Sequence, residues 1–264
     1  MLFKFTILKH FYSYFIKSAK IMIDKKGTRI NKYLSEAGFC SRREADKLIE
    51  KGLVKINGKV PPIGTKVWPG DKVTVEENAV SKEKNKFVYI AFNKPTGIVC
   101  TTDTKREKNN IVDFINYPKR IFPIGRLDKP SEGLIFLTSD GDIVNKILRA
   151  SNAHEKEYIV TVDKNIDYDF IRKMSRGIPI MGTVTKNCQT EKISNKKFKI
   201  ILTQGLNRQI RRMCEYLGYE VKQLKRVRIM NIKLNLKVGE WREFTSKELL
   251  EINLILKNSS KTAS

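Results

Sequence analysis

The chain has 264 residues, which is long enough for one catalytic domain with a buried core and a smaller accessory domain. Its 52 Lys and Arg side chains outnumber its 28 Asp and Glu side chains and give a formal net charge of +24. This charge favours a polyanionic partner, either nucleic acid or an anionic membrane surface, although a Lys-rich composition that only keeps the protein soluble would give the same excess.

The cysteines and histidines argue against several classes of site. The four cysteines form no C-x-x-C pair, so we expect neither a disulfide framework nor a zinc site, and a reducing, cytoplasmic location fits. With only two histidines, His-rich metal sites are disfavoured and most hydrolase mechanisms lose their usual base. There is also no phosphate-binding loop or dinucleotide glycine fingerprint, so the sequence predicts no metal and no cofactor.

Residues 1–27 are predicted to be an extension outside the fold. Residues 1–22 contain no acidic side chain and many apolar ones, which is a composition found in targeting segments. Lysines interrupt every apolar run, however, and about 20 uninterrupted apolar residues are needed to cross a membrane. We therefore expect no membrane span. A weak signal peptide is an alternative that the composition leaves open, and Met22 could serve as a second start.

Residues 28–76 predict a compact module that begins with two short helices. Apolar residues at helical spacing start at Ile30, and Gly38 follows where a left-handed residue closes a helix. The second helix opens with the pattern of a capping box, in which the hydroxyl of Ser41 caps the helix and Glu44 lies three residues further on. Both helices have one apolar face, which is predicted to be buried within the module.

A small antiparallel sheet is predicted after the helices. Alternating apolar residues lead into Asn57-Gly58, a dipeptide that suits a type I′ hairpin turn, and the alternation resumes at Val73 after a Pro-Gly-Asp turn. The outward positions of the two helices carry the cations Arg29, Lys32, Arg42, Arg43 and Lys47. Acidic residues share these helices, so charge alone does not distinguish an RNA-binding face from an ordinary solvated surface.

The segment RINKYLSEAGFCSRREADKLIEKGLVKINGKV, continued through WPGDKVTV, resembles the S4 RNA-binding domain along nearly all of its length. In that family the helical pair docks on structured RNA. The resemblance therefore implies that the five cations named above contact RNA.

Residues 77–86 have the polar composition of a linker, and residues 87–256 are predicted to form the second domain. Strands are predicted at FVYIAF, IVCT, GLIFLT, EYIVTV, FKIILT and 224–236, an exposed loop at 102–110, and helices near 142–150, 167–176, 207–217 and 246–256. Strands that outnumber helices without strict alternation favour an α+β fold with a mixed, largely antiparallel sheet flanked by helices. Residues 257–264 are predicted to be a disordered tail.

The strongest candidate for a catalytic group is Asp128, which ends the segment FPIGRLD before KPSEG and the strand GLIFLT. A single Asp in a loop is more often a turn or cap residue. The string GRLDKPSEGLIFLTSDG, however, is similar to the signature motif of the pseudouridine synthases, in which the aligned Asp is the catalytic carboxylate. The resemblance implies this role for Asp128, and implies that Arg126 occupies the space left by a flipped nucleotide.

Two further motifs follow in the order found in that family. The triplet KEY resembles the motif whose tyrosine stacks on the target base, which implies this role for Tyr158; without the resemblance, a core tyrosine would be the better interpretation. The string GLNRQIRRM resembles the motif whose basic residue pairs with the catalytic Asp, which implies that role for Arg211. The neighbouring Arg208 and Arg212 fit a basic helix that lies on RNA phosphates.

The matches extend from residue 28 to about residue 256 and are similar to the RsuA-like branch, which joins an S4 domain to the catalytic domain. They imply a cytoplasmic, monomeric enzyme that acts on large-subunit ribosomal RNA, with tRNA as a possible second substrate. A non-enzymatic, ribosome-associated S4 protein is the main alternative, although it would be expected to lack Asp128, Tyr158 or Arg211. A glycosidase that uses Asp128 and Glu132 as an acid and base pair is disfavoured by the net charge.

Overall fold

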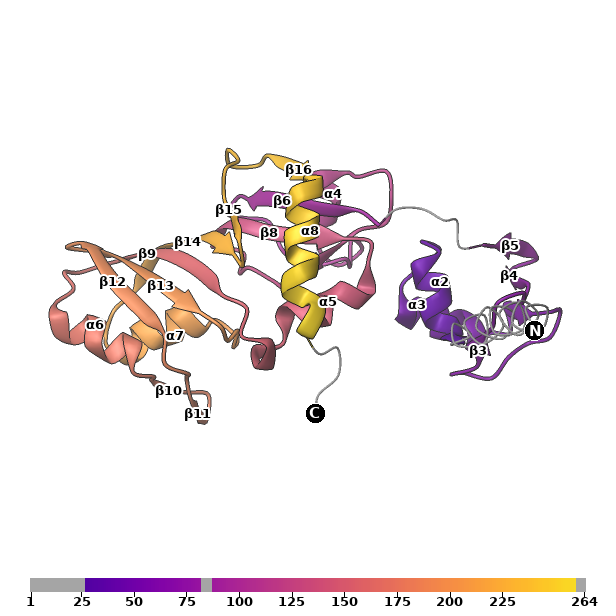
Figure 1. Ribbon diagram of the computed structural model, residues 1–264, viewed down its shortest axis with the longest axis horizontal. Coiled ribbons are helices and arrows are strands. Elements are labelled where there is room, and N and C mark those ends of the chain that lie inside the picture. Colours follow the sequence, from indigo (N-terminus) through magenta and orange to yellow (C-terminus); the bar gives the residue numbers. More distant parts are fainter. Residues whose placement is uncertain (1–26, 82–86, 260–264) are drawn as a thin grey trace, which may run out of the picture. The chain divides into compact units, whose positions relative to one another are not determined.

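The computed structural model describes residues 27–81 and 87–259 (Figure 1). The chain divides into two compact units, one up to Lys86 and one from Phe87 onward. The predicted N-terminal extension, apart from Gly27, lies outside the described residues. Within the two described ranges, every helix is too short or too polar to cross a lipid bilayer.

The described residues of the first unit, 27–81, form two helices and two small antiparallel sheets. The elements are β1 (Thr28–Arg29), α2 (Ile30–Glu36), α3 (Arg42–Glu50), β2 (Val54–Ile56), β3 (Lys66–Val67), β4 (Val73–Val75) and β5 (Asn78–Val80). Strands pair in the order β2-β4-β5, and β1 pairs with β3. The predicted cap is present, because Ser41 Oγ accepts a hydrogen bond from Glu44 N at 3.2 Å. Apolar side chains of both helices pack with Val54, Val73 and Val75 in one core.

Two details of the first unit differ from the expectation. Asn57 and Gly58 have φ angles of 50° and 81°, as a type I′ turn requires, but they close only an isolated bridge between Ile56 and Lys59. The strand that pairs with β2 in the sheet is β4, so only the turn of the predicted hairpin is present. The segment predicted as a linker begins with a strand, since residues 78–80 form β5 against β4.

The second unit is built on a nine-stranded sheet. Seven of its strands follow the order β12-β13-β9-β14-β8-β6-β16, and the other two pair at its side, β15 with β14 and β7 with β8. The strands are β6 (Tyr89–Lys94), β7 (Phe122–Ile124), β8 (Glu132–Thr138), β9 (Lys156–Val162), β12 (Gln189–Ser194), β13 (Lys197–Leu202), β14 (Val221–Ile229), β15 (Ile232–Lys233) and β16 (Trp241–Glu243). All pairings are antiparallel except that of β14 with β8. The predicted α+β fold with a mixed, largely antiparallel sheet is confirmed.

Helices cover both faces of this sheet, and β8 shows how the faces are divided. Its alternate residues Ile135 and Leu137 belong to one core cluster, and Leu134 and Phe136 belong to the other. The first cluster contains side chains of α4 (Ile111–Ile115), α6 (Tyr168–Ser175) and α7 (Gln209–Tyr216), and the second contains side chains of α5 (Gly141–Leu148) and α8 (Ser246–Ile255) (Figure 1). A short hairpin, β10 (Pro179–Ile180) and β11 (Thr183–Val184), lies between α6 and β12 in the sequence.

The parallel junction of β8 and β14 brings the two strands unusually close. Gly133 pairs with Arg226 in register, and a Cβ added to Gly133 would lie 2.3 Å from the Arg226 carbonyl oxygen. The glycine also has a φ of +113°. Across the sheet, Lys94 pairs with Gly133, and Arg226 pairs with Tyr158, so these four residues form one row over β6, β8, β14 and β9.

Two predicted elements of the second unit are wrong. The residues IVCT, 98–101, form no strand, because Val99 bridges only to Asn110 of the following loop. That loop leads into α4, which was not predicted; Asn110 Oδ1 caps it by accepting hydrogen bonds from Val112 N and Asp113 N. At the other end, Leu256–Asn258 form a 3-10 turn with a buried Leu256, so the predicted disorder does not begin at residue 257.

Helix α8 begins with a capping box that an arginine reinforces. Thr245 Oγ1 accepts from Glu248 N at 3.2 Å, and Glu248 Oε2 accepts from Thr245 N at 2.8 Å. Arg242 donates to both carboxylate oxygens of Glu248 at 2.7 Å. These bonds from Arg242, and then those from Thr245, lower the pKa of Glu248 from 4.5 to about 2.

We therefore expect Glu248→Gln to destabilise the fold at neutral pH and to matter less in acid. A carboxylate whose pKa is lower in the folded state stabilises the fold above the unfolded pKa, and this stabilisation is lost as the pH falls toward the folded pKa. For this largely covered pair we expect about 2 kcal/mol at pH 7, with more than half of it lost at about pH 3. Urea unfolding at both pH values measures the difference. Glu251→Gln on the same helix, which bonds to the neutral Asn231, is the matched control, and an equal loss at both pH values would refute the expectation.

Candidate active site

Asp128 lies in the loop between β7 and β8, where backbone hydrogen bonds form at Asp128 and at the next residue. Ser131 N donates to the Asp128 carbonyl oxygen at 3.0 Å, which closes a tight turn, and Gly97 N donates to the Lys129 carbonyl oxygen at 2.8 Å. Leu127 is buried beneath the loop. These contacts fix the backbone of Asp128 while its side chain remains 34 % exposed. The carboxylate is therefore held in place and is open to a ligand.

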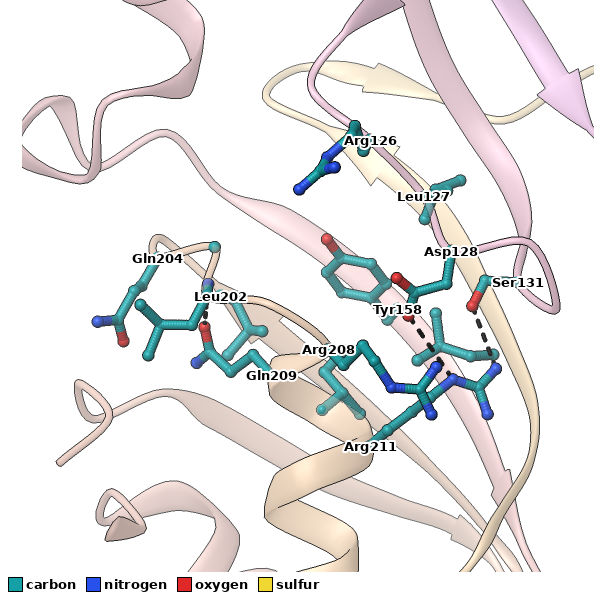
Figure 2. A pocket seen from close by; sticks show the side chains of 14 residues that line it. Arg126, Leu127, Asp128, Ser131, Tyr158, Leu202, Gln204, Arg208, Gln209 and Arg211 are labelled. Atoms are coloured by element: carbon teal, nitrogen blue, oxygen red, sulfur yellow. Dashed lines mark hydrogen bonds and ion pairs between the residues drawn. The ribbon is translucent and has the colours of Figure 1, made fainter. Parts of the chain in front are cut away.

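Arg211, on the first turns of α7, is anchored to the same loop. Its Nη2 donates to the Pro130 carbonyl oxygen at 3.3 Å and to Ser131 Oγ at 3.2 Å, and its Nη1 donates to the Val221 carbonyl oxygen at 3.1 Å. The predicted pairing with Asp128 is present as an ion pair, with 3.8 Å between Arg211 Nε and Asp128 Oδ2 (Figure 2). Nε makes no hydrogen bond within the described part of the chain, so the pair leaves the carboxylate oxygens able to accept a further bond.

The electrostatics of Arg211 agree with this geometry. Burial lowers the pKa of Arg211 most, and the nearby charge of Arg208 lowers it further, while Asp128 acts in the opposite direction. A charged guanidinium beside a carboxylate favours the ionised form of both groups. The arrangement therefore places a guanidinium beside the Asp128 carboxylate without a hydrogen bond from Nε.

Tyr158 lies on β9 with its ring buried at the base of the pocket. Along β9, Lys156, Tyr158, Val160 and Val162 share the inward face. The cross-strand neighbour of Tyr158 is Arg226, whose guanidinium carbon lies 5.9 Å from the centre of the tyrosine ring. The ring is thus fixed by its strand and by a cation, as a stacking platform requires.

These residues meet in one pocket (Figure 2). Its polar and aromatic lining includes Arg126, Asp128, Tyr158, Arg208 and Arg211, and its apolar lining includes Leu202, Leu206, Ile210 and Leu224. An adjoining larger pocket shares Arg126, Asp128, Tyr158 and Arg208 and adds Lys156 and Arg226. Segments far apart in the sequence thus bring the three residues of the proposed catalytic set to one cavity.

The remaining residues that the sequence singled out do not line these two pockets. Arg212 is bonded to Asn207, through the carbonyl oxygen and Oδ1, and does not line either pocket. Glu132 forms an ion pair with Lys225 at 3.1 Å and is likewise absent from both linings, so it is not placed to act as an acid or base with Asp128. The five cations Arg29, Lys32, Arg42, Arg43 and Lys47 belong to the first unit; Arg42, Arg43 and Lys47 are exposed on α3, and Lys32 pairs with Glu36.

Buried cations near Asp128 are the part of the site that sequence reasoning missed. Lys94 is fully buried and donates to the carbonyl oxygens of Pro95 and Ile98 at 2.7 and 2.9 Å. Burial, and then the charge of Arg226, lowers the pKa of Lys156 to about 8. The signal for Lys156 was available, because it is a cation at an inward position of the alternating strand KEYIVTV.

The site contains a carboxylate, a guanidinium, an aromatic platform and several cations. Such a set can bind an anionic substrate, stack a planar base and carry out nucleophilic or proton-transfer chemistry. Among residues 27–81 and 87–259, no three His, Cys, Asp or Glu side chains are grouped so that they could hold a metal ion.

The family models match both units of the chain. The model described as RNA pseudouridylate synthase matches residues 88–216, and the S4 domain model matches residues 28–73. The structure is also similar to a solved structure titled "Crystal structure of pseudouridylate synthase", with a TM-score of 0.63 and 28 % identity over 85 % of this chain and 99 % of that chain.

Curated relatives agree over most of the chain. The dual-specificity RNA pseudouridine synthase RluF of Escherichia coli (strain K12) is 58 % identical over 90 % of this chain and 83 % of its own length. The ribosomal large subunit pseudouridine synthase B of Bacillus subtilis (strain 168) is 35 % identical over 86 % of this chain and 96 % of its own length. Both identities are high enough, over enough of each chain, to establish common ancestry and a common reaction type. The chain therefore belongs to the RsuA-like family of RNA pseudouridine synthases, as the sequence motifs predicted, and is an isomerase that acts on RNA.

Proposed function

We propose that this enzyme converts a specific uridine of large-subunit ribosomal RNA to pseudouridine, with Asp128 as the catalytic carboxylate. The observation that carries the proposal is the meeting of Asp128, Tyr158 and Arg211 in one pocket. The names of the two curated relatives support this choice of RNA. The Bacillus subtilis relative is named for the large ribosomal subunit, and the Escherichia coli relative is named for a dual specificity. On the second ground we propose tRNA as a further substrate.

The chemistry assigns a separate task to each residue. The reaction breaks the bond from N1 to C1′, turns the uracil within the pocket and joins C5 to C1′, so that the proton lost from C5 is balanced by one gained at N1. Asp128 either attacks C1′ or removes a ribose proton, and both routes need a carboxylate in its ionised form. Arg211 lies beside this carboxylate. Tyr158 provides the platform for the base and the group that takes the C5 proton. Arg126, exposed at the rim, fills the space that the flipped nucleotide leaves.

The proposed assembly is a cytoplasmic monomer that needs no metal ion or cofactor. All side chains of the site come from one chain, and the isomerisation requires no redox step or transferred group. Residues 28–76 would bind and place the RNA, and residues 87–256 would hold the complete active site.

The proposal is tested by mapping pseudouridines in total RNA from cells with and without the gene. Loss of one ribosomal site in the deleted strain, restored by the wild-type gene and not by Asp128→Asn, is the expected result. A non-enzymatic RNA-binding protein would leave the pseudouridine map unchanged. Loss of tRNA sites alone would contradict the ribosomal assignment and leave the reaction type intact.

Neutralising the exposed cations of α3 is expected to weaken RNA binding and to flatten its dependence on salt. Each phosphate contact contributes roughly 0.7 to 0.9 to the slope of log K against log salt concentration, so Arg42→Gln, Arg43→Gln and Lys47→Gln together should lower that slope by about 2. Binding titrations between about 50 and 200 mM salt measure it. The control replaces the exposed Lys233, Lys237 and Lys247 of the second unit. Equal slopes for the two triple variants would show that α3 does not contact phosphates.

A further inference from the structure

Two buried cations line the larger pocket, and neither has a role in the mechanism above. Arg226 on β14 is 4 % exposed, and Lys156 on β9 is 8 % exposed. Arg226 is the cross-strand neighbour of Tyr158, and its guanidinium carbon lies 5.9 Å from the centre of the tyrosine ring. Lys156 precedes Tyr158 by two residues on the same buried face of β9. We call Lys156 and Arg226 the cation pair.

The bonds of the cation pair leave donors unused. Arg226 Nε donates to the Leu134 carbonyl oxygen at 2.6 Å, but its Nη2 is buried and makes no hydrogen bond to any described residue. Lys156 Nζ donates to the His154 carbonyl oxygen at 3.2 Å, and an ammonium group has three hydrogens to donate. A buried donor without a partner is costly, so such groups in native proteins call for an explanation.

No carboxylate compensates the charge of the cation pair. Among the described residues no ion pair involves Lys156 or Arg226, and the charge that acts on Lys156 is the like charge of Arg226. The acids on this pocket are Asp103, Glu107 and Asp128; of these, Asp103 pairs with Arg106 and Asp128 with Arg211. Two like charges thus line the same pocket without an acidic partner of their own.

We propose that the cation pair is a binding site for one phosphodiester group of the RNA, adjacent to the flipped uridine. The inference rests on the proposed function and extends it by assigning a substrate contact to Lys156 and Arg226. A phosphodiester carries the negative charge that would compensate the two positive charges of the cation pair. Its oxygens also suit the planar fork of a guanidinium and the point charge of an ammonium group.

A uracil carbonyl is the other acceptor that could reach the cation pair, but it fits less well. A neutral carbonyl would satisfy one donor and leave two buried positive charges without compensation. A phosphodiester satisfies donors on both side chains and offsets charge in the ground state. The two occupants differ in effect, because a phosphate contact contributes to RNA affinity, whereas a contact to charge that develops on uracil contributes to the rate of the bound complex.

The first test is Lys156→Met, which removes the charge and keeps an unbranched apolar side chain. We expect the dissociation constant for a ribosomal RNA fragment containing the target uridine to rise at least about tenfold. The melting temperature should rise or stay unchanged, since removal of an uncompensated buried charge does not destabilise a fold. The matched control is Lys192→Met, whose ammonium group also donates to a backbone carbonyl, that of Ile166, but lies outside both pockets. An unchanged dissociation constant for Lys156→Met, with or without a slower reaction of the bound RNA, would overturn the proposal.

The second test neutralises the phosphate instead of the protein. RNA fragments carry a single uncharged methylphosphonate at one linkage flanking the target uridine, and a 2′-deoxy phosphodiester at the same position is the reference. At one linkage, wild type should bind the neutral fragment at least about tenfold more weakly, whereas Lys156→Met should bind both fragments nearly equally. A penalty that is the same in both proteins, or absent at every flanking linkage, would contradict the assignment.

The same fragments separate the inference from the function on which it rests. If wild type does not convert the unmodified fragment or any other ribosomal RNA, the proposed function fails. If conversion proceeds but the loss of affinity from Lys156→Met and the loss from the methylphosphonate are additive, only the phosphate site is refuted. Arg226→Lys keeps the charge beside Tyr158 and loses the fork, so it should show a smaller loss of affinity than Arg226→Met.

Discussion

Asp128→Asn is expected to abolish pseudouridine formation, with a decrease of at least about four orders of magnitude in the single-turnover rate. Asparagine is nearly isosteric with aspartate, but it can neither attack C1′ nor accept a ribose proton. RNA affinity should be retained, because the phosphate contacts of the protein come from cations. The measurement is the conversion of a transcribed ribosomal RNA fragment with excess enzyme.

Stability is expected to change little in the same variant. Removing one partner of a fully buried pair costs about 3 to 5 kcal/mol, whereas an exposed pair contributes about 1 kcal/mol or less. Asp128 is 34 % exposed and lies 3.8 Å from Arg211 without a hydrogen bond from Nε, so the smaller value applies. Thermal unfolding measured beside the rate separates lost chemistry from lost folding. A folded Asp128→Asn enzyme that reacts at the wild-type rate would show that the active site lies elsewhere.

Two variants serve as controls for this experiment. Asp103→Asn makes the same chemical change on a loop that lines the larger pocket, and its rate should stay within about tenfold of wild type. Tyr158→Phe keeps the stacking ring and removes the hydroxyl group. Because we assign removal of the C5 proton to that hydroxyl, Tyr158→Phe should bind RNA normally and react slowly; a normal rate would limit Tyr158 to stacking.

Gly133→Ala is expected to have the largest effect on folding. The added Cβ would lie 2.3 Å from the Arg226 carbonyl oxygen and 2.6 Å from its nitrogen, and a φ of +113° is itself strained for alanine. Because backbone atoms cannot move aside as a flexible side chain can, β8 and β14 must separate. We expect a loss of more than about 3 kcal/mol in the free energy of unfolding, measured by urea denaturation.

The matched control is Gly182→Ala in the turn between β10 and β11. Gly182 has a φ of +73°, but an added Cβ would meet nothing within 4 Å. The control therefore includes the backbone strain without the collision, and should cost only about 1 to 2 kcal/mol. Equal losses in the two variants would show that close approach of the strands is not what requires Gly133.

The residues of the candidate site were predictable to different degrees, for identifiable reasons. Asp128, Tyr158 and Arg211 were indicated by motif resemblance, and the structure brings them to one pocket, although their catalytic roles stay predictions. The pairing of Arg211 with Asp128 was also indicated by the resemblance. Its distance of 3.8 Å and the anchoring of Arg211 to the Asp128 loop do not follow from sequence, because these contacts join segments about 80 residues apart. The cation pair escaped notice because a lysine or arginine within a strand is usually assigned to the solvated face.

The fold shows the same division between local and distant information. Strands β8 and β9 were predicted because each has a clear apolar pattern, whereas β12 has mostly exposed side chains and no such pattern to detect. IVCT has the composition of a strand but finds no partner strand, since Val99 bonds to the loop before α4. Propensity describes what a segment can form, and pairing in the sheet decides what it does form.

The single parallel junction of β8 and β14 also has a consequence for the order of folding. Two antiparallel pairs flank this junction in the sheet order, β6 with β8 on one flank and β9 with β13 on the other, and each pair can form by itself. We expect the Asp128 loop and Arg211 to meet only after β14 has docked on β8. The bond from Arg226 Nε to the Leu134 carbonyl oxygen that accompanies this docking joins residues 92 positions apart. Contacts between residues so far apart in the sequence close long loops and form slowly. A partly folded chain can therefore contain most of the sheet and still lack the pocket, so that activity arises only with the complete topology.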